Sequence, residues 1–470
     1  MLWQQNHLIC TQAVSNDKRV HIIILGQIII SIFKLFKELE GGRALKRLFY
    51  NCVALAIIAL FLCGSNTVYA KEEKAKDFQI KDSVLVKYKG TNSEVIVPDG
   101  VTIIGRNAFS YNQAITSVIL PDGVTRIENK AFDRCINLQS VSMSDSVTYI
   151  GDETFYHCEK LSSIHTMQNV ETIGIRAFAY CSNLYDLGGL DKLSFIGDAN
   201  TFFGTGWMEE EQKKSDMIII NNILVYGGNC SGYVEIPKGI THIASVAFVG
   251  ANEMTHVVIP NTVKSIGNVA FAELMNLESV RMADSVESIG EQAFRHCRKL
   301  KNVRLSNSLK SLEWGLFEGC TRLYNITLPE ACESISHIVF SDCRRLKYIT
   351  FPEKMNENIC EQMLLDLSRF KSSCKIYLTE SNKSKALVKY LQKQGWELEE
   401  LALQKEEISL KKGEIFELRM NSYAKCKWKS SNPSVVAVNY YGKIRAKKKG
   451  TAVITATLYG KTYKCKVTVK

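Results

Sequence analysis

The 470-residue chain is 46% apolar and 23% charged, so it can bury a large core and is long enough for more than one domain. Its formal net charge of +11 is unevenly distributed: residues 405–470 hold 16 Lys and Arg against 4 Asp and Glu, whereas residues 71–404 carry a net charge of −5. Because the long middle region has no basic excess, the composition excludes a protein that binds a nucleic-acid backbone along its length.

The N-terminal region predicts export. A cationic stretch at residues 43–47 precedes the apolar run 53–62, and the small residue Ala70 ends a short segment before a polar one. This order of positive, apolar and small residues is typical of a secretory signal peptide. We therefore assign residues 1–70 to an N-terminal extension with a signal peptide, and expect the mature chain to begin near Lys71.

A second apolar stretch, residues 21–33, lies upstream of this signal and leaves two interpretations open. The stretch is short for a membrane span, which needs about 20 residues. Either residue 1 lies upstream of the true start, or the stretch anchors the protein in the membrane through its N-terminus. Both interpretations place the rest of the chain outside the cytoplasm, as a secreted or cell-surface protein.

Phenylalanines recur along the next region at a nearly constant step of 23 residues. They are Phe109, Phe132, Phe155, Phe178, Phe202, Phe248, Phe271, Phe294, Phe317 and Phe340. The step from Phe202 to Phe248 is two periods, so one divergent unit lies between them. A 23-residue period falls within the range of about 20–29 residues of leucine-rich repeats. The predicted fold of residues 71–378 is therefore a leucine-rich-repeat solenoid of short parallel strands.

One frame surrounds each phenylalanine. In one unit it reads Ile289-Gly290, Ala293-Phe294, Cys297, Leu300, Val303, Leu305 and Leu309. The alternation at Val303-Arg304-Leu305 predicts a short strand whose first and third side chains point inward. The glycine of the frame, Gly290 in this unit, fits either a turn with positive φ or a close approach of two backbones.

The frame resembles the BspA-like leucine-rich-repeat family of bacterial surface proteins over residues 80–352. The divergent unit shares this resemblance, because residues 222–226 and 234–237 repeat the opening pattern of residues 83–88 and 95–98. We therefore expect a second start of the solenoid there. The resemblance implies a surface location and adhesion to host or matrix proteins, which the period itself does not show.

Six of the 15 cysteines stand at one position of the frame: Cys135, Cys158, Cys181, Cys297, Cys320 and Cys343. Leu274 occupies the same position in another repeat, so the position requires a buried apolar group and not a thiol. A free cysteine behaves as a small hydrophobic residue. We therefore predict a reduced ladder of core thiols in preference to disulfides or metal ligands.

The period stops after Pro352. Residues 375–378 are predicted to form a last strand, and residues 382–394 are predicted to form an amphipathic helix that ends at Gly395. Because the open end of a solenoid must be covered, we assign residues 379–404 to a helical cap and linker.

Residues 405–470 have an all-β pattern of short strands separated by Gly, Asn and Pro turns, which predicts a small sandwich. The run from Trp428 to Val438 resembles the bacterial immunoglobulin-like group 2 module, which implies a spacer or a carbohydrate-contacting unit. A disulfide between Cys426 and Cys465 is expected, because each lies two residues from another inward position.

The turn at Lys447, Lys448 and Lys449 has two interpretations: a solvated turn, or a contact to anionic cell-wall polymers. The basic excess of residues 405–470 favours attraction to such polymers, which salt would weaken.

The sequence holds no motif for catalysis, metal binding or a cofactor: there is no His-Glu-x-x-His, no phosphate-binding Gly-rich loop and no Gly-x-Ser-x-Gly. The pairs His157-Cys158 and His296-Cys297 do not predict a nucleophile, because both cysteines occupy the core position of the frame. We therefore predict that the chain is not an enzyme and has no cofactor.

A binding face is expected where the middle residue of each repeat strand points outward. The candidates for ligand contact on or beside this face are Tyr185, Arg281, Lys301, Arg304, Tyr324, Lys347 and Tyr348. Tyr and Arg on a rigid sheet are common in protein recognition, although a merely solvated sheet is the alternative. The predicted function is adhesion to a host matrix protein or another surface protein, and the alternative is a cell-wall scaffold held by the basic tail.

Overall fold

The computed structural model describes residues 75–368, 373–378, 385–422, 424 and 426–470. The predicted signal peptide and the apolar stretch 21–33 lie outside the described residues. Within the described ranges, no helix has both the length and the apolar character that a membrane crossing requires.

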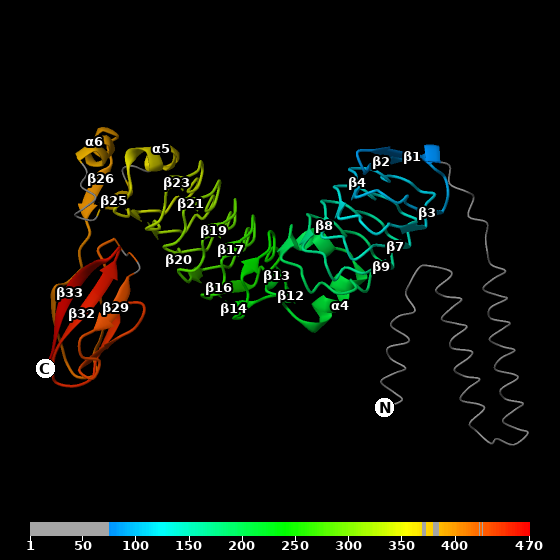
Figure 1. The fold of residues 1–470 in the computed structure, drawn as a ribbon. Helices are drawn as coiled ribbons and strands as arrows, with labels where there is room; N and C mark the ends of the chain where they lie inside the picture. Colours follow the sequence, from blue (N-terminus) through cyan, green and yellow to red (C-terminus); the bar gives the residue numbers. More distant parts are fainter. Residues whose placement is uncertain (1–74, 369–372, 379–384, 423, 425) are drawn as a thin grey trace, which may run out of the picture. The chain divides into compact units, whose positions relative to one another are not determined.

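Most repeats of the solenoid contribute two short strands, and most of these strands pair in parallel with their counterpart one repeat later (Figure 1). We name the two resulting rows after the sequence that forms them, the Ile-Gly row and the Val-x-Leu row. In the first half of the solenoid, residues 75–206, a short 3₁₀ helix η1 (Ala75–Asp77) precedes the Ile-Gly row, which consists of β1 (Phe78–Lys81), β2 (Val84–Tyr88), β4 (Ile103–Ile104), β6 (Arg126–Ile127), β8 (Tyr149–Ile150), β10 (Thr172–Ile173) and β11 (Phe195–Ile196). The Val-x-Leu row of this half consists of β3 (Glu94–Ile96), β5 (Ser117–Ile119), β7 (Ser140–Ser142) and β9 (Ser163–His165).

The divergent unit is a second start of the solenoid, as predicted. The 3₁₀ helix η2 (Ala199–Phe202) and helix α4 (Gly206–Lys214) end the first half, and the Thr205 hydroxyl caps α4 by accepting a hydrogen bond from the Met208 amide. Strands β12 (Ile218–Ile220) and β13 (Ile223–Tyr226) then form an antiparallel pair, as β1 and β2 do at the first start.

The second half, residues 218–378, repeats the two rows. After β12 and β13, its Ile-Gly row continues with β15 (His242–Ile243), β17 (Ser265–Ile266), β19 (Ser288–Ile289), β21 (Ser311–Leu312) and β23 (Ser334–Ile335). Its Val-x-Leu row consists of β14 (Gly232–Glu235), β16 (Met254–Ile259), β18 (Ser279–Met282), β20 (Asn302–Arg304), β22 (Asn325–Thr327) and β24 (Tyr348–Thr350).

The ten phenylalanines of the frame form the core between the two rows. All ten are fully buried. Within each half, neighbouring rings stack nearly parallel, with centroids 4.7–5.8 Å apart. The core therefore repeats with the sequence, as the period predicts, and each repeat buries its ring only because its neighbours are present.

The frame glycines are needed for close backbone approach and not for positive φ, which decides between the two interpretations of Gly290. A Cβ atom on Gly290 would lie 2.5 Å from the backbone nitrogen of Asn268 in the preceding repeat. The left-handed φ angles of the repeat fall on other residues, such as Gln292 at 56° and His296 at 57°.

The six cysteines of the frame are buried free thiols, as predicted. Each donates its S–H to the carbonyl oxygen of the phenylalanine in the preceding repeat, as Cys297 does to Phe271 at 3.0 Å between sulfur and oxygen. Burial raises the pKa of the Cys297 thiol to about 12. A thiol held neutral in this way is a structural group and not a nucleophile.

The end of the solenoid is covered by more structure than the sequence predicted. Helix α5 (Glu357–Asp366), strand β25 (Lys375–Leu378), helix α6 (Lys385–Lys393) and strand β26 (Glu397–Glu400) follow one another. Strand β25 agrees with the prediction. Strand β26 instead lies in the segment assigned to a linker, and it pairs in parallel with β25, so the sheet of the Val-x-Leu row continues into the cap. Leu387 and Leu391 are the buried residues of α6, whereas Ala386 is exposed.

The C-terminal domain has its own core between two sheets. One sheet contains β27 (Glu407–Leu410), β33 (Lys461–Val469), β32 (Gly450–Leu458) and β29 (Lys427–Ser430), and the other contains β28 (Ile415–Glu417), β31 (Lys443–Ala446) and β30 (Val436–Val438). All pairings are antiparallel except that of β27 with β33. The predicted small all-β domain is therefore present.

The predicted disulfide in this domain is not formed, because Cys426 and Cys465 are both buried thiols that are not bridged. The strand register explains why. Cys465 on β33 pairs with Ile454 on β32, and Ile454 pairs in turn with Ser430 on β29. Ser430 lies four residues beyond Cys426 along the chain. Four residues of strand span about 13 Å, whereas a disulfide requires Cα atoms within about 7 Å.

Candidate functional site

The C-terminal domain lies against the Val-x-Leu row of the second half, and Tyr459 is the centre of this contact. The Tyr459 hydroxyl is buried and donates to the carbonyl oxygen of Leu328 at 2.6 Å, with the carbonyl oxygen of Thr350 at 3.4 Å. Thr350 at the end of β24 is only 1% exposed. Two ion pairs, Lys461 with Glu353 at 3.8 Å and Lys427 with Asp284 at 3.7 Å, add to the contact.

A second contact forms where two strand arginines meet Tyr440 of the C-terminal domain. The guanidinium carbons of Arg281 and Arg304 lie 5.4 Å and 5.6 Å from the centroid of the Tyr440 ring. Arg304 also donates two hydrogen bonds to the Asp284 carboxylate, at 3.1 Å and 3.2 Å. The interactions hold Arg304 in one orientation, whereas Arg281 is exposed and makes no ion pair among the described residues.

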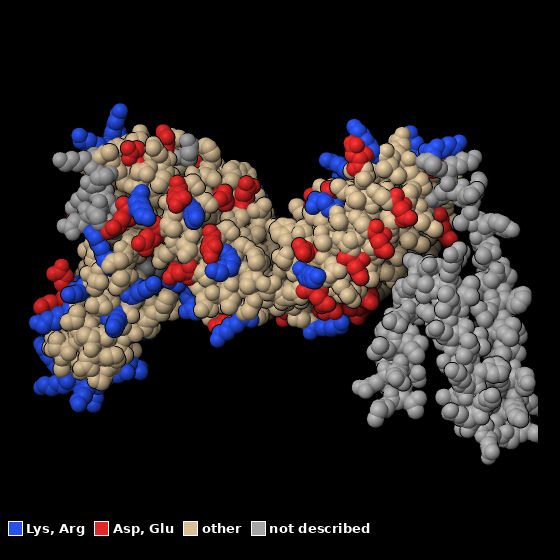
Figure 2. Space-filling view, in the orientation of Figure 1, with Lys and Arg blue, Asp and Glu red and all other residues tan. Residues whose placement is uncertain are grey.

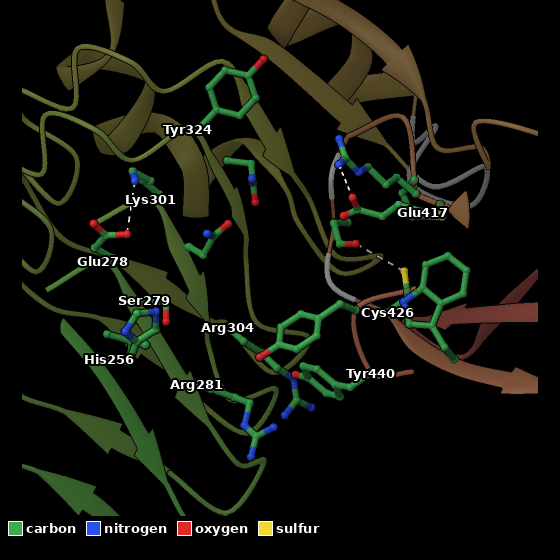
Figure 3. A pocket seen from close by; sticks show the side chains of 18 of the residues that line it. His256, Glu278, Ser279, Arg281, Lys301, Arg304, Tyr324, Glu417, Cys426 and Tyr440 are labelled. Atoms are coloured by element: carbon green, nitrogen blue, oxygen red, sulfur yellow. Dashed lines mark hydrogen bonds and ion pairs between the residues drawn. The ribbon is translucent and has the colours of Figure 1, made fainter. Parts of the chain in front are cut away.

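Residues of the solenoid and of the C-terminal domain together line a cleft of about 720 Å³, and Tyr440 is one of them. Figure 3 shows Tyr324, Lys301 and Glu278 on the solenoid side, Glu417 and Cys426 on the side of the C-terminal domain, and Arg281, Arg304 and Tyr440 close together at one end. A cleft of this size lies in the range of about 300–1,000 Å³ that is usual for ligand sites.

The cleft is strongly cationic. Six cations line it, Arg281, Lys301, Arg304, Arg322, Arg345 and Arg419, against two carboxylates, Glu278 and Glu417. Lys301 pairs with Glu278 at 3.3 Å, and Arg419 pairs with Glu417 at 2.5 Å. Arg322 and Arg345 are exposed and have no ion pair within the part of the chain that the structure describes.

Aromatic side chains also line the cleft. Tyr324, Trp428, Tyr440 and Tyr441 all line it, and Tyr441 is 61% exposed. The aliphatic residues that contribute to the lining, such as Val280, Leu418 and Met420, are buried in the two cores. A ligand in the cleft would therefore meet cations, polar groups and ring faces.

Four of the candidate residues predicted from the sequence come together in the cleft: Arg281, Lys301, Arg304 and Tyr324. Lys347 is exposed beside it, 6.0 Å from the Tyr324 ring centroid. Tyr348 is half-buried, because it packs against the core of the C-terminal domain. Tyr185 is 61% exposed but belongs to the first half, where its ring lies against Gly206 at the start of α4.

The turn at Lys447, Lys448 and Lys449 does not line the cleft, although all three residues are exposed. Figure 2 shows Lys and Arg side chains predominating over the C-terminal domain, whereas both signs of charge are mixed over the solenoid. The domain is therefore basic over its surface, and this turn is one part of that surface.

Several residues of the cleft were not among the candidates predicted from the sequence. Arg322 and Arg345 lie one period apart, two residues after the frame cysteine, and Lys299 holds the same place one repeat earlier. This cation, which recurs at one position of successive repeats, was the sequence signal that could have identified Arg322 and Arg345. No such signal existed for Arg419, Trp428, Tyr440 and Tyr441, because their place in the site depends on how two domains pack. Among the described residues there is no cluster of His, Cys, Asp and Glu that could hold a metal ion.

Comparison with known proteins gives the following relatives. Solved structures similar to this chain include a leucine-rich cell surface protein from Faecalibacterium prausnitzii (22% identity, 66% of this chain and 95% of that chain, TM-score 0.32) and the pneumococcal vaccine antigen PcpA (19% identity, 67% and 91%, TM-score 0.38). A leucine-rich repeat protein from Eubacterium ventriosum is similar at 22% identity over 58% of this chain and 82% of that chain, with a TM-score of 0.35. No match was found among curated proteins.

A model of one protein family also matches the chain. The family model described as the BspA type leucine rich repeat region matches residues 79–206 and 230–368 in six copies, which together are more than half of the chain. The chain belongs to the BspA-type leucine-rich repeat family.

Proposed function

We propose that the chain is a non-catalytic adhesion protein of the bacterial cell surface, which recognises an extracellular ligand in the cleft between the Val-x-Leu row and the C-terminal domain. The observation that carries the proposal is the cleft itself, a cavity of about 720 Å³ with six cations and four aromatic rings on its walls. Arg and aromatic residues are the groups that most often dominate binding energy at recognition sites.

The surface location is supported by the signal-peptide pattern of residues 1–70 and by a similar solved structure that is described as a cell surface protein. A binding role is supported by the rigidity of the face. Parallel ladders hold the strands that carry Arg281 and Arg304, and the buried phenylalanines beneath them fix the distance between repeats. Side chains held on such a scaffold lose little entropy when a ligand binds.

The test compares the full-length mature protein with variants in binding to a decellularised extracellular matrix. We expect Arg281→Ala with Tyr441→Ala to reduce binding strongly, because both side chains are exposed in the cleft. Tyr185→Ala with Lys192→Ala is the matched control, since it removes one exposed tyrosine and one exposed cation from the first half. Equal binding by wild type and the cleft variant would contradict the proposal.

A second candidate function is a cell-wall scaffold held by the basic C-terminal domain. The observation that favours it is the net charge of +12 on residues 405–470, with Lys447, Lys448 and Lys449 exposed on one turn. We also propose that this domain is an immunoglobulin-like group 2 module, a role in keeping with its two sheets.

The scaffold is tested by binding of the full-length protein to isolated cell walls. Wild type should bind in dilute buffer and elute as salt rises, because the Debye length falls from about 10 Å at 0.1 M salt to about 3 Å at 1 M. Changing all three lysines to Glu should abolish most of this binding. Equal binding at low and high salt would rule out an electrostatic scaffold.

A further inference from the structure

We propose that the cleft binds an acidic polysaccharide, a sugar chain that carries carboxylate or sulfate groups. This inference rests on the proposed function, because it names the chemistry of the ligand that the cleft recognises. The unpaired cations of the cleft, its aromatic rings and the burial of its lining aliphatic residues support this inference.

The cations of the cleft require an anionic ligand. Three of the six cations pair with carboxylates, whereas Arg281, Arg322 and Arg345 have no ion pair among the described residues, so the cleft has three unpaired positive charges. A guanidinium presents a planar fork of donors that matches a carboxylate or a sulfate with two parallel hydrogen bonds. Like charges gathered in a cleft also raise the local concentration of an oppositely charged ligand.

The spacing of these arginines favours a polymeric ligand and not a single small anion. Arg322 and Arg345 occupy equivalent positions in successive repeats, and Arg281 and Arg304 do the same on the paired strands β18 and β20. Arg419 belongs to the C-terminal domain, on the opposite wall of the cleft. Strands of neighbouring repeats lie about 4.8 Å apart. The positive charge is therefore spread along the repeats, so a polymer with regularly spaced acidic groups can meet several cations at once.

The rest of the lining favours sugar over peptide. The side chains that reach the cleft surface beside the cations are polar, such as Asn302, or aromatic, such as Tyr441, whereas the lining aliphatic residues are buried. A bound peptide would need apolar pockets for its anchoring side chains. The ring faces of Tyr441 and Trp428 instead provide flat apolar surface against which the C–H face of a sugar ring can pack, while its hydroxyls bond to the polar groups.

Tyr440 contributes one further group. Its hydroxyl is buried beside the cleft and has no hydrogen-bond partner among the described residues. A buried hydroxyl without a partner costs free energy, so a ligand oxygen that reaches it would gain a hydrogen bond that the protein itself does not supply. Sugar hydroxyls and carboxylates are both suitable partners.

The test is a titration of the full-length mature protein with four probes: a heparin oligosaccharide, a polygalacturonate oligomer, neutral dextran and poly-glutamate of matched charge. Wild type should bind the two acidic sugars and not dextran. The order of heparin and polygalacturonate shows whether sulfate or carboxylate is preferred. Binding of poly-glutamate as tight as that of the acidic sugars would overturn the proposal, because the cleft would then select acidic protein segments or charge alone.

Two matched pairs of variants locate the binding. Arg322→Glu with Arg345→Glu should weaken sugar binding at least about tenfold, whereas Arg106→Glu with Lys192→Glu, at two exposed cations of the first half, makes the same change in charge outside the cleft and should have little effect. Tyr441→Ala, at a ring 61% exposed, should weaken binding several-fold, whereas Tyr111→Ala, at a ring 63% exposed in the first half, should not. If Lys447→Glu with Lys448→Glu weakens binding more than the arginine pair of the cleft does, the sugar binds the basic surface of the C-terminal domain and the proposal is wrong.

The matrix experiment separates this proposal from the proposed function. If heparin and polygalacturonate compete for matrix binding, both stand. If the cleft variants lose matrix binding but no acidic sugar binds or competes, the cleft is an adhesion site for another ligand and only the sugar proposal fails. If acidic sugars bind the cleft while matrix binding is unchanged by the variants, the adhesion proposal fails.

Discussion

The two halves of the solenoid share one frame but present different faces. In the first half, the strands of the Val-x-Leu row expose small hydroxyls and aliphatic groups, as Ser117 and Ile119 do on β5. In the second half, the same outward positions carry Arg281 and Arg304, and the C-terminal domain packs against this row. The inward positions are the same in both halves, so they determine the fold, whereas the outward positions determine what each half binds.

The largest expected effect tests whether the cores of the two halves are equivalent. Phe132→Ala and Phe271→Ala each remove a fully buried ring from a stack, so each should lower the free energy of unfolding by about 3–5 kcal/mol. Denaturant unfolding followed by circular dichroism measures both. A loss below about 1 kcal/mol in either variant would show that the ring does not support the core of that half.

A smaller effect is expected where the repeats approach each other most closely. Gly290→Ala places a Cβ atom against the backbone of Asn268 in the preceding repeat, so we expect a loss of about 1–3 kcal/mol. Glu313 holds the equivalent frame position one repeat later, and Glu313→Ala is the matched control, which should change stability much less. Thermal unfolding compares them, and a Gly290→Ala variant as stable as wild type would show that the repeats are loosely spaced.

The cysteine ladder predicts a loss of stability at alkaline pH. Burial raises the pKa of Cys297 to about 12, whereas in the unfolded chain the thiol ionises near its ordinary value of 9.0. Because the folded pKa is the higher one, the stabilising contribution is complete below pH 9 and is lost as pH rises from 9 toward 12. At pH 10 the loss amounts to about 1.4 kcal/mol for this thiol.

Cys297→Leu tests this prediction, since Leu274 naturally occupies the same position one repeat earlier. The variant should lose less stability than wild type between pH 8 and pH 10 under reducing conditions. An identical pH dependence of unfolding in the two proteins would mean that Cys297 does not titrate differently in the folded and unfolded states.

The sequence predicted those parts of the fold that recur. The phenylalanines, the frame cysteines and the inward strand residues were found because the same physical requirement repeats every 23 residues. Helix α5 and strand β26 were not predicted, because the cap occurs once and has no period. Strand β26 reads Glu397-Leu398-Glu399-Glu400, a polar segment whose place in the sheet comes from pairing with β25 and not from its own pattern.

The site was predictable only on one wall. Arg281, Lys301, Arg304 and Tyr324 follow from the alternation of the repeat strands, but the other wall consists of residues such as Tyr440 and Trp428 from a separate domain. The disulfide prediction failed for a related reason. Two inward cysteines of one small domain were paired without knowledge of the register, which places them far apart along the strands.

The smallest expected effect concerns the contact between the C-terminal domain and the second half of the solenoid. Tyr459→Phe removes the hydroxyl that donates to the Leu328 carbonyl oxygen and leaves that buried oxygen without this partner, which should cost about 1 kcal/mol. The loss should fall on the docking of the C-terminal domain and not on the solenoid core, because the ring of Tyr459 stays in place. Hydrogen exchange should therefore rise at β22 and β24, which the domain covers, and stay unchanged at β5 and β7. Tyr441→Phe, which alters an exposed hydroxyl of the same domain, is the control. Equal exchange in wild type and the Tyr459 variant at all four strands would show that the hydroxyl does not hold the domain on the face, and that the cleft depends on the arginine contacts with Tyr440 instead.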